Sequence, residues 1–238
     1  GYRGRIEERF GGGSADGAFC DVWIHAVSAG DANAATPLVQ RLLNEKRNLD
    51  ILITTMTPTG AQQVVDTFGD QVRHRFAPYD YPFAIRRFLD RFSPKLLVLM
   101  ETEIWPNMIR LCHQRGIQVV MANVRLSERS AKGYRSVLPL VREGLNQISL
   151  FATQSEADRQ NLLSLGVAKS KTHRTGSMKF EIKMSASVNE VAQAVRRDWS
   201  PNRPVVTAGS THEGEEDLLL SAFQSLLNDF PDLLLVIA

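Results

Sequence analysis

The stretch Leu96-Leu-Val-Leu-Met-Glu-Thr-Glu-Ile-Trp-Pro-Asn107 joins an apolar run to two acids and a tryptophan. The apolar half has the composition of a strand covered on both faces, and helical spacing begins at Trp105. Carboxylates are therefore expected where a strand passes into a helix, which is where open α/β folds bind their ligands. The stretch Ala208-Gly-Ser-Thr-His-Glu-Gly-Glu-Glu216 follows a second apolar run in the same way.

Outward from these two stretches, apolar runs rich in Val, Ile and Leu alternate with segments of helical spacing. Strands are predicted at Asp21–Val27, Leu49–Thr54, Lys95–Met100, Gln118–Ala122, Ser149–Ala152, Val205–Ala208 and Leu233–Ile237. Helices are predicted at Asn33–Glu45, Ala61–Phe68, Pro82–Phe92, Trp105–Arg115 and Glu156–Leu165. This alternation predicts an α/β fold of parallel sheets covered by helices.

The order of these elements predicts two lobes. Residues 1–20 are an N-terminal segment with a flexible connector, Gly11-Gly-Gly-Ser-Ala-Asp-Gly17, and residues 21–186 are the first lobe. The alternation breaks over residues 187–203, a linker region, and residues 204–238 begin a second α/β lobe. The chain starts without methionine and stops inside a predicted strand, so further protein is expected beyond Ala238.

Composition is that of a soluble globular protein. The chain has 238 residues, 43% of them hydrophobic and 23% charged, with a formal net charge of +2. This charge balance predicts no nucleic-acid partner, and no apolar run reaches the ~18 residues that cross a bilayer. The two cysteines, Cys20 and Cys112, lie in no metal-ligand spacing and predict no disulfide framework.

Basic residues are concentrated in two regions. These local excesses of positive charge are formed by Arg73, Arg75, Arg86, Arg87 and Arg91, and by Arg125, Arg129, Lys132 and Arg135. Solvated helix faces are one interpretation, and a surface that meets anionic head groups or phosphates is the other. The pattern alone leaves both open.

A candidate base lies in His25-Ala-Val-Ser-Ala-Gly-Asp31, where a strand ends and a helix begins. Small residues allow a substrate to approach the backbone, and the free N–H groups of a helix start favour an anion. Asp31 could accept a proton from a hydroxyl, but a role as N-cap is the alternative that spacing alone favours. His25 lies within the strand run and is expected to be a hydrogen-bonded core residue.

Other candidates follow later strands. Glu101 and Glu103 are two residues apart on a chain expected to be extended, so they should share a face, and capping is the alternative for Glu103. Arg125 or Arg129 could hold a phosphate or carboxylate. Lys179 could stabilise developing negative charge or be an ordinary surface lysine.

The second acidic stretch also has two interpretations. Gly209, Ser210 and Thr211 offer backbone and hydroxyl donors at the edge of a lobe, which is a weak phosphate-cradle pattern. The acids that follow suit the start of a helix and need no function. His212-Glu-Gly-Glu215 lacks the second histidine of a zinc-protease motif.

Together, these motifs closely resemble those of the 3-deoxy-D-manno-octulosonic acid (Kdo) transferases of lipopolysaccharide biosynthesis. They occur in family order over nearly the whole chain, at Ser28–Asp31, Glu101–Asn107, Asn123–Ser130, Gly176–Phe180 and Ala208–Glu216. The resemblance implies a GT-B-type glycosyltransferase of two Rossmann-like lobes, the first binding a lipid A precursor and the second CMP-Kdo. It also implies inverting transfer without a metal or other cofactor, at the cytoplasmic face of the inner membrane, with the usual anchor segment absent from this chain.

The resemblance assigns roles residue by residue. Asp31 stands where the family has its general base, often a glutamate, and Glu101 and Lys179 match transition-state stabilisers. The acceptor would be bound by Ser28, Gly30, Arg125 and Arg129, and the donor by Gly209, Ser210, Thr211, His212 and Glu213. Two alternatives stay open, another GT-B enzyme such as a nucleotide-sugar epimerase and a non-catalytic acceptor-binding module.

Overall fold

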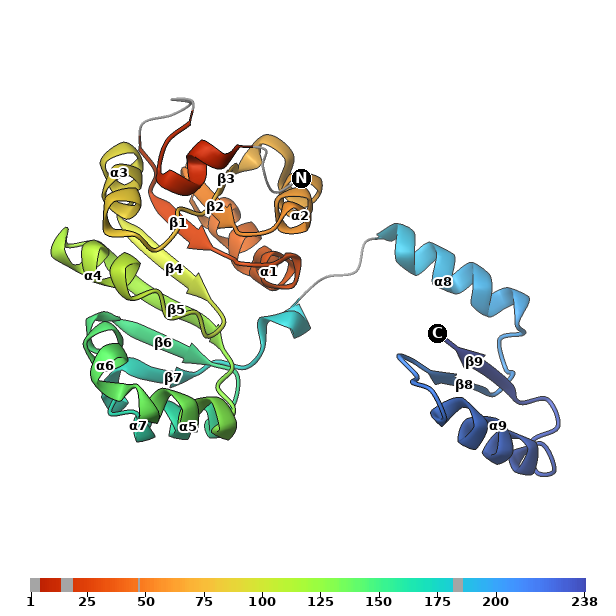
Figure 1. The fold of residues 1–238 in the computed structure, drawn as a ribbon. Helices are drawn as coiled ribbons and strands as arrows, with labels where there is room; N and C mark the ends of the chain where they lie inside the picture. The colour runs from red at the N-terminus through yellow and green to blue at the C-terminus, as the bar shows by residue number, and fades with distance from the viewer. Residues whose placement is uncertain (1–4, 14–18, 47, 182–185) are drawn as a thin grey trace. The chain divides into compact units, whose positions relative to one another are not determined.

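A computed structural model describes residues 5–13, 19–46, 48–181 and 186–238 of the chain. The chain divides into two compact units, Gly1–Ile182 and Lys183–Ala238, and each is described by itself. The larger unit holds a parallel sheet wrapped by helices (Figure 1), and the smaller one holds a short sheet and two helices.

The larger unit is built on a seven-stranded sheet in the order β3-β2-β1-β4-β5-β6-β7, with every neighbouring pair parallel. Its strands are β1 (Val22–His25), β2 (Ile51–Thr55), β3 (Arg73–Phe76), β4 (Leu96–Met100), β5 (Gln118–Val124), β6 (Leu150–Thr153) and β7 (Thr172–Arg174). The five strands predicted in this region are confirmed. β3 and β7 were not predicted, because their sequences Arg-His-Arg-Phe and Thr-His-Arg lack the apolar run of a covered strand; both lie at sheet edges.

Helices and short 3-10 turns connect the strands. They are η1 (Ile6–Phe10), α1 (Ala29–Glu45), α2 (Pro58–Phe68), η2 (Gly69–Gln71), α3 (Pro82–Phe92), α4 (Pro106–Gln114), α5 (Glu128–Ser136), α6 (Leu138–Gln147), α7 (Glu156–Ser164), η3 (Lys169–Lys171) and η4 (Met178–Glu181). α1 begins four residues before the predicted Asn33, because the hydroxyl of Ser28 already caps it.

The core lies on both faces of the sheet. Successive residues of a strand point to opposite faces, so Leu97 and Leu99 join one buried cluster while Val98 and Met100 join the other. The first cluster packs against α3, α4 and α6, and the second packs against α1 and α2 (Figure 1). Because helices cover both faces, a ligand can reach the sheet only where its strands end. The side of the sheet formed by the carboxyl ends of the strands is called the carboxyl edge below, and the opposite side the amino edge.

The glycine-rich segment after η1 is packed where the structure describes it. Gly11 has φ 73°, and a Cβ on it would lie 2.3 Å from the carbonyl oxygen of Ala84 on α3. Gly11 and Gly12 are both buried. The prediction of a flexible connector is therefore wrong for residues 11–13, since only glycine permits this backbone and this approach. Residues 14–17 of the predicted connector lie outside the described residues.

The smaller unit pairs β8 (Val205–Ala208) with β9 (Leu234–Ile237) in parallel, flanked by α8 (Ala186–Asp198) and α9 (Glu215–Leu226). Both predicted strands are confirmed, but the expectation that their faces are covered is wrong for this chain. Among its described residues only Leu233 is a buried hydrophobic side chain, and Leu218 on α9 is 74% exposed. Two strands with two helices cannot enclose both faces of a sheet.

Candidate active site

The carboxyl edge of the large sheet brings together three of the residues singled out by sequence. Asp31 lies in the first turn of α1 after β1, Glu101 directly follows β4, and Lys179 lies on η4. The Nζ atom of Lys179 is 3.5 Å from Oε1 of Glu101, with the side chains 52% and 28% exposed. η4 packs against α1, so the lysine-carrying turn lies beside the helix that carries Asp31.

Asp31 takes part in a capping box. The Ser28 backbone N–H and hydroxyl both donate to Oδ2 of Asp31 at 2.9 Å, and the Asp31 N–H donates back to the Ser28 hydroxyl at 3.3 Å. The N-cap is therefore Ser28, and the alternative of Asp31 as N-cap is wrong; Asp31 is the third helical residue. No donor among the described residues bonds its Oδ1. One carboxylate oxygen is thus held, while the other has no hydrogen-bond donor among the described residues.

Glu101 has a left-handed backbone, with φ 58°. Its N–H donates to the carbonyl of Ala122 at the end of β5, at 2.8 Å. The prediction that Glu101 and Glu103 share a face of an extended strand is wrong, because the chain leaves the strand at Met100 and turns at Glu101. A left-handed glutamate stores conformational strain, and such strain is concentrated at functional sites.

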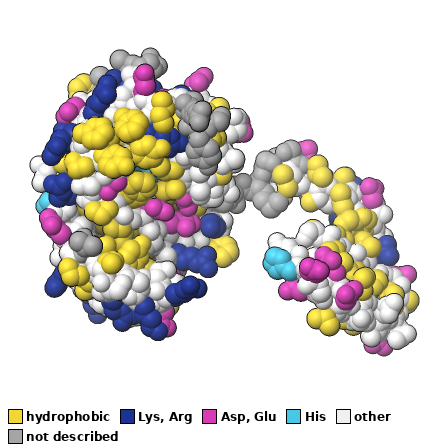
Figure 2. All heavy atoms as spheres, viewed as in Figure 1, with side chains coloured by type: hydrophobic (Ala, Val, Ile, Leu, Met, Phe, Trp, Pro, Cys, Tyr) yellow, Lys and Arg dark blue, Asp and Glu magenta, His cyan; other side chains and the backbone are white. Residues whose placement is uncertain are grey.

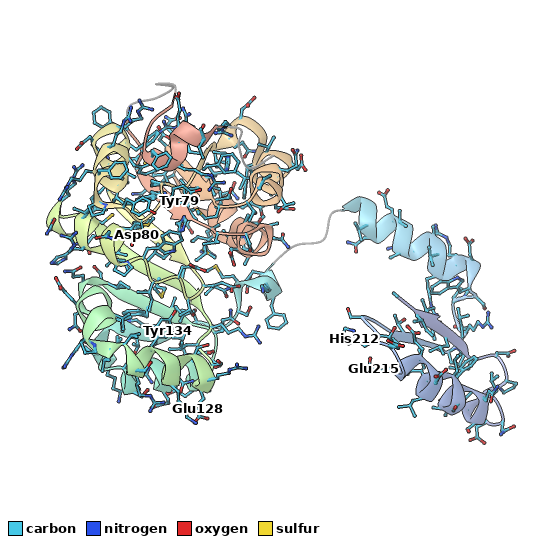
Figure 3. The ribbon with its side chains drawn as sticks, in the orientation of Figure 1. Tyr79, Asp80, Glu128, Tyr134, His212 and Glu215 are labelled. Atoms are coloured by element: carbon cyan, nitrogen blue, oxygen red, sulfur yellow. The ribbon has the colours of Figure 1, made fainter. Side chains whose placement is uncertain are left out.

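Glu103 is a half-buried carboxyl that lies near both a hydrogen-bond donor and other carboxylates. Its Oε2 accepts the indole N–H of Trp105 at 3.0 Å. Burial, together with the charges of Asp31 and Glu101, raises its pKa above the usual value even though the indole bond lowers it. Burial raises the pKa of Tyr134 on α5, and the charge of Glu103 adds to this rise (Figure 3). Asp31, Glu101, Glu103 and Tyr134 therefore share one electrostatic environment.

The capping role considered for Glu103 is taken by another acid. Asp80, in the segment between β3 and α3 (Figure 3), accepts the backbone N–H groups of Asn107 at 3.0 Å and Met108 at 2.7 Å. These are among the otherwise unpaired N–H groups of the start of α4. Asp80 therefore fixes the strand-to-helix turn that carries Glu103. The sequence does not reveal this contact, because Asp80 lies 27 positions before Asn107.

His25 is the core residue that the sequence predicted. It is fully buried, its Nδ1 lies 3.0 Å from the hydroxyl of Thr54, and burial lowers its pKa to about 4. Its ring meets the ring of Trp105 edge to face, with centroids 5.1 Å apart. A neutral imidazole therefore supports the indole that holds Glu103.

The predicted acceptor residues lie around the same edge. Ser28 and Gly30 open α1, and a Cβ on Gly30 would meet only the Ser28 hydroxyl, at 3.6 Å. Arg125 and Arg129 are exposed, and neither side chain has a partner among the described residues. The hydroxyl of Thr102 donates to the Arg125 carbonyl at 2.6 Å, which ties the loop after β5 to the loop after β4.

The predicted donor residues lie in the smaller unit, whose placement relative to Asp31 is not described. Ser210 has φ 58° and its N–H bonds the Ala238 carbonyl at 2.7 Å, so the turn after β8 is anchored to the end of β9. The hydroxyl of Thr211 donates to Glu216 at 2.8 Å, and the His212 N–H donates to Glu215 at 2.9 Å (Figure 3). Gly209 and Glu213 are exposed. The acids of α9 thus organise this turn.

Three members of the first group of basic residues are bonded within the fold. Arg73 forms a two-bond pair with Asp50, and Arg75 is buried with its Nη1 3.2 Å from Glu8. Arg91 donates to the carbonyl of Gly13 at 2.6 Å. The interpretation of Arg73 and Arg75 as contacts to head groups or phosphates is therefore wrong, because the fold neutralises them. In the second group, Lys132 pairs with Glu128 at 3.1 Å.

The described residues contain neither a metal-binding cluster nor a membrane-spanning helix. No group of three or more histidine, cysteine, aspartate or glutamate side chains there could hold a metal ion. No described helix is long and apolar enough to span a bilayer.

Comparison with known proteins gives this geometry its context. A family model for 3-deoxy-D-manno-octulosonic-acid transferase (kdotransferase) matches residues 4–182. The chain is 40% identical over 238 residues to a 3-deoxy-D-manno-octulosonic acid transferase of Haemophilus influenzae, covering 99% of this chain and 56% of that protein. It is 35% identical over 212 residues to one of Bordetella pertussis, covering 86% and 48%. The chain thus spans about half the length of these relatives.

Solved structures share the fold at low sequence identity. The UDP-GlcNAc 2-epimerase of Neisseria meningitidis superposes with TM-score 0.64 at 15% identity, over 91% of this chain and 64% of the epimerase. The UDP-GlcNAc 2-epimerase of Methanocaldococcus jannaschii gives 0.59 at 11%, over 92% and 65%. The chain therefore has the GT-B-type α/β fold that the sequence predicted.

Proposed function

Because the chain belongs to the 3-deoxy-D-manno-octulosonic-acid transferase family, we propose that the whole protein transfers Kdo from CMP-Kdo to a lipid A precursor. The proposed transfer inverts the anomeric centre and uses no metal. The observation that carries it is the group of Asp31, Glu101 and Lys179 at one sheet edge, with a 3.5 Å contact between the last two. An open α/β sheet binds ligands at this edge.

Asp31 is the proposed general base. Its carboxylate accepts the proton of a glucosamine hydroxyl of the acceptor, the oxygen forms a bond to the anomeric carbon of Kdo, and the bond from that carbon to CMP breaks. CMP leaves with the electron pair. The capping box supports this role, since it holds Oδ2 and fixes the direction of the unbonded Oδ1.

Glu101 and Lys179 are the proposed stabilisers of charge in the transition state. An ammonium group near the leaving phosphate or the Kdo carboxylate would offset negative charge as CMP departs. Glu101 would orient this ammonium, as the contact between them supports. The Lys179 side chain is 52% exposed, which leaves room for a donor to approach it.

Acceptor binding is proposed for the loops beside Asp31. Arg125 and Arg129 are cations without a protein partner in the described residues, at the start of α5. An unpaired guanidinium fork matches the oxygen geometry of phosphate, which a lipid A precursor carries. Ser28 and Gly30 would line the backbone side of the sugar, and Gly209, Ser210, Thr211, His212 and Glu213 would contact the donor.

An anionic membrane surface is the proposed site of action, and the contact is assigned to an aromatic surface of Phe10, Tyr79, Tyr81 and Phe83. The rings of Phe10 and Phe83 stack with centroids 6.2 Å apart, as do Tyr81 and Phe83 at 6.0 Å. Tyr81 and Phe83 are 55% and 58% exposed, and the exposed Arg86 and Arg87 lie one helical turn away. Figure 2 shows hydrophobic side chains gathered over η1 and α3 with basic ones beside them. Aromatic rings next to arginines suit a lipid–water interface.

The decisive experiment follows CMP release by the full-length protein. CMP that appears only when both CMP-Kdo and a lipid A precursor are present, with Kdo found on the acceptor by mass spectrometry, supports transfer. Conversion of a nucleotide sugar to a free isomer would favour the epimerase alternative, and acceptor binding without CMP release would favour the binding module. Family membership favours transfer over both, because the likeness to epimerases extends to the fold alone.

Vesicle flotation tests the membrane contact separately. Replacing Tyr81 and Phe83 by serine should lower binding to vesicles of anionic phospholipid at least about tenfold, because each ring loses a buried apolar contact. Replacing Arg73 and Asp50 together by serine is the matched control and should leave binding unchanged. Equal binding by all three proteins would remove the aromatic surface from the proposal.

A further inference from the structure

Asn123 has an unusual environment at the carboxyl end of β5. It is fully buried, its φ is 57°, and the pairing of β5 with β6 shifts register between Met121 and Val124. Asparagine tolerates the left-handed region better than other residues with a side chain. Its Nδ2 has no hydrogen-bond partner among the described residues, and a buried donor without a partner is costly. This side chain is therefore not explained by stability alone.

The acceptor atom of the same side chain reaches η4. Oδ1 of Asn123 accepts the backbone N–H of Met178 at 3.1 Å, across 55 positions of sequence. The side chain of Met178 packs against the core cluster of the second sheet face. The next residue is Lys179, whose Nζ contacts Glu101. One amide thus fixes the turn from which the lysine projects.

The other partner of the pair is fixed at the same place. The N–H of Glu101 bonds the carbonyl of Ala122, the residue directly before Asn123. The end of β5 therefore holds the backbone of Glu101 on one side and the backbone of Met178 on the other. Two left-handed residues make this arrangement, Glu101 directly after β4 and Asn123 within the neighbouring β5.

We propose that Asn123 is a positioning residue that sets Lys179 against Glu101 by bonding the turn at Met178. This role rests on the proposed function, because it assumes that Lys179 is part of the reacting site. Asn123 itself touches no substrate, because it is fully buried. Asn123 therefore affects turnover only by positioning Lys179.

Asn123→Gly tests this in the full-length protein, because glycine keeps the left-handed backbone and removes the side chain whose Oδ1 accepts the Met178 N–H. With CMP-Kdo and a lipid A precursor, kcat should fall roughly 10- to 100-fold while KM changes little, since ~1 Å of misplacement can cost ~10²-fold. Asn48→Gly is the matched control, an exposed asparagine at φ 71° with no side-chain bond to described residues, and should keep the wild-type kcat. In a Lys179→Ala background, Asn123→Gly should change kcat less than about twofold. An undiminished further loss there, or a wild-type kcat for Asn123→Gly alone, overturns the proposal.

A second measurement is independent of turnover. Acetic anhydride labelling, followed by peptide mass spectrometry, compares Lys179 with Lys132, which pairs with Glu128 elsewhere on the surface. In Asn123→Gly, Lys179 should label at least about threefold faster because its ion pair is no longer held, and Lys132 should be unchanged. Equal labelling of Lys179 in both proteins overturns the positioning role. Absence of acceptor-dependent CMP release by the wild type would instead defeat the proposed function, and the labelling would still decide this one.

Discussion

The two edges of the large sheet treat charge in opposite ways. At the amino edge the charges next to three strands are paired, with Lys95 2.7 Å from Asp21 and Arg73 2.7 Å from Asp50. At the carboxyl edge, Asp31, Glu101 and Glu103 lie in one environment with a single described ammonium contact, Lys179 at 3.5 Å. Both edges belong to the same seven strands, so the sheet itself does not cause the difference.

Left-handed residues occur at both edges, but their burial differs. Glu101 and Asn123 at the carboxyl edge are partly and fully buried, whereas Asn48 and Ser93, which precede β2 and β4 at the amino edge, are exposed. The pairing at the amino edge has a visible consequence, since Lys95 holds the pKa of Asp21 below its usual value. Strain and excess negative charge both reduce stability, and they coincide at the edge where ligands bind. This difference is the one expected if the amino edge stabilises the fold and the carboxyl edge carries the proposed reaction.

The largest expected effect is a loss of kcat that would distinguish a catalytic base at Asp31 from a helix-capping residue. Asp31 and Asp158 each complete a capping box, with Ser28 on α1 and Ser155 on α7. Asp31→Asn should lower kcat by ~10²–10⁴-fold with little change in thermal midpoint, because an amide can still cap but cannot take a proton.

Asp158→Asn is the control for that variant. Asp158 also accepts the Leu126 N–H at 2.7 Å, so this variant should lose stability and keep most of its turnover. CMP release and thermal melting of the two full-length variants give the comparison. If Asp31→Asn loses stability but turns over like the wild type, the capping box is its whole role and the base is elsewhere.

The next effect concerns the ion pair. Lys179→Ala should reduce kcat by about 10²-fold, because one group that offsets developing charge is worth roughly this factor. Glu101→Gln should cost less, and the double variant should equal Lys179→Ala, since the carboxylate would act through the lysine. Steady-state kinetics of the wild type, the two single variants and the double variant measure these changes in kcat. Fully additive losses would mean that Glu101 has a separate task.

Sequence patterns predicted the scaffold better than its edges. Runs of Val, Ile and Leu predicted five strands of the sheet, because covered strands require apolar residues on both faces. β3 escaped prediction because Arg73 and Arg75 are charged. Their acceptance in the sheet depends on Asp50 and on Glu8, which precedes Arg75 by 67 residues, and local pattern cannot show such a pairing.

The candidate site was predictable only in part. The resemblance to Kdo transferases singled out Asp31, Glu101 and Lys179, and the structure brings all three to one edge. Ser28 followed three positions later by an acid was a readable capping-box signal, and it would have corrected the start of α1. Asp80 at α4 and Asn123 at Met178 make non-local bonds between a side chain and a backbone N–H. Such bonds follow from the folded chain and leave no spacing in the sequence.

A smaller effect is expected at the amino edge. Asp50→Ala removes both hydrogen bonds that Arg73 makes to its carboxylate, at 2.9 and 2.7 Å. The free energy of unfolding should fall by about 0.5–1 kcal/mol, since both side chains are partly solvated. Turnover should be unchanged at temperatures well below the melting midpoint. A loss of kcat without a loss of stability would contradict the division of roles between the edges.

The smallest expected effect has the opposite sign and depends on pH. Burial and the neighbouring charges of Asp31 and Glu101 raise the pKa of Glu103, so the folded chain holds its proton more tightly than the unfolded chain. Stability from this group therefore decreases as pH rises from the ordinary carboxyl pKa through the raised one. Glu103→Gln removes that loss while its amide oxygen can still accept the Trp105 N–H. The thermal midpoint of the variant relative to wild type should thus be higher at pH 8 than at pH 4.

Calorimetry at the two pH values measures this difference, which should be on the order of one or two degrees because the group is only half buried. Glu7→Gln is the matched control, since Glu7 is exposed and its side chain has no bonding partner among the described residues. Its midpoint should show no such dependence. If Glu103→Gln also shows none, the carboxylates of the carboxyl edge do not repel one another in the folded protein.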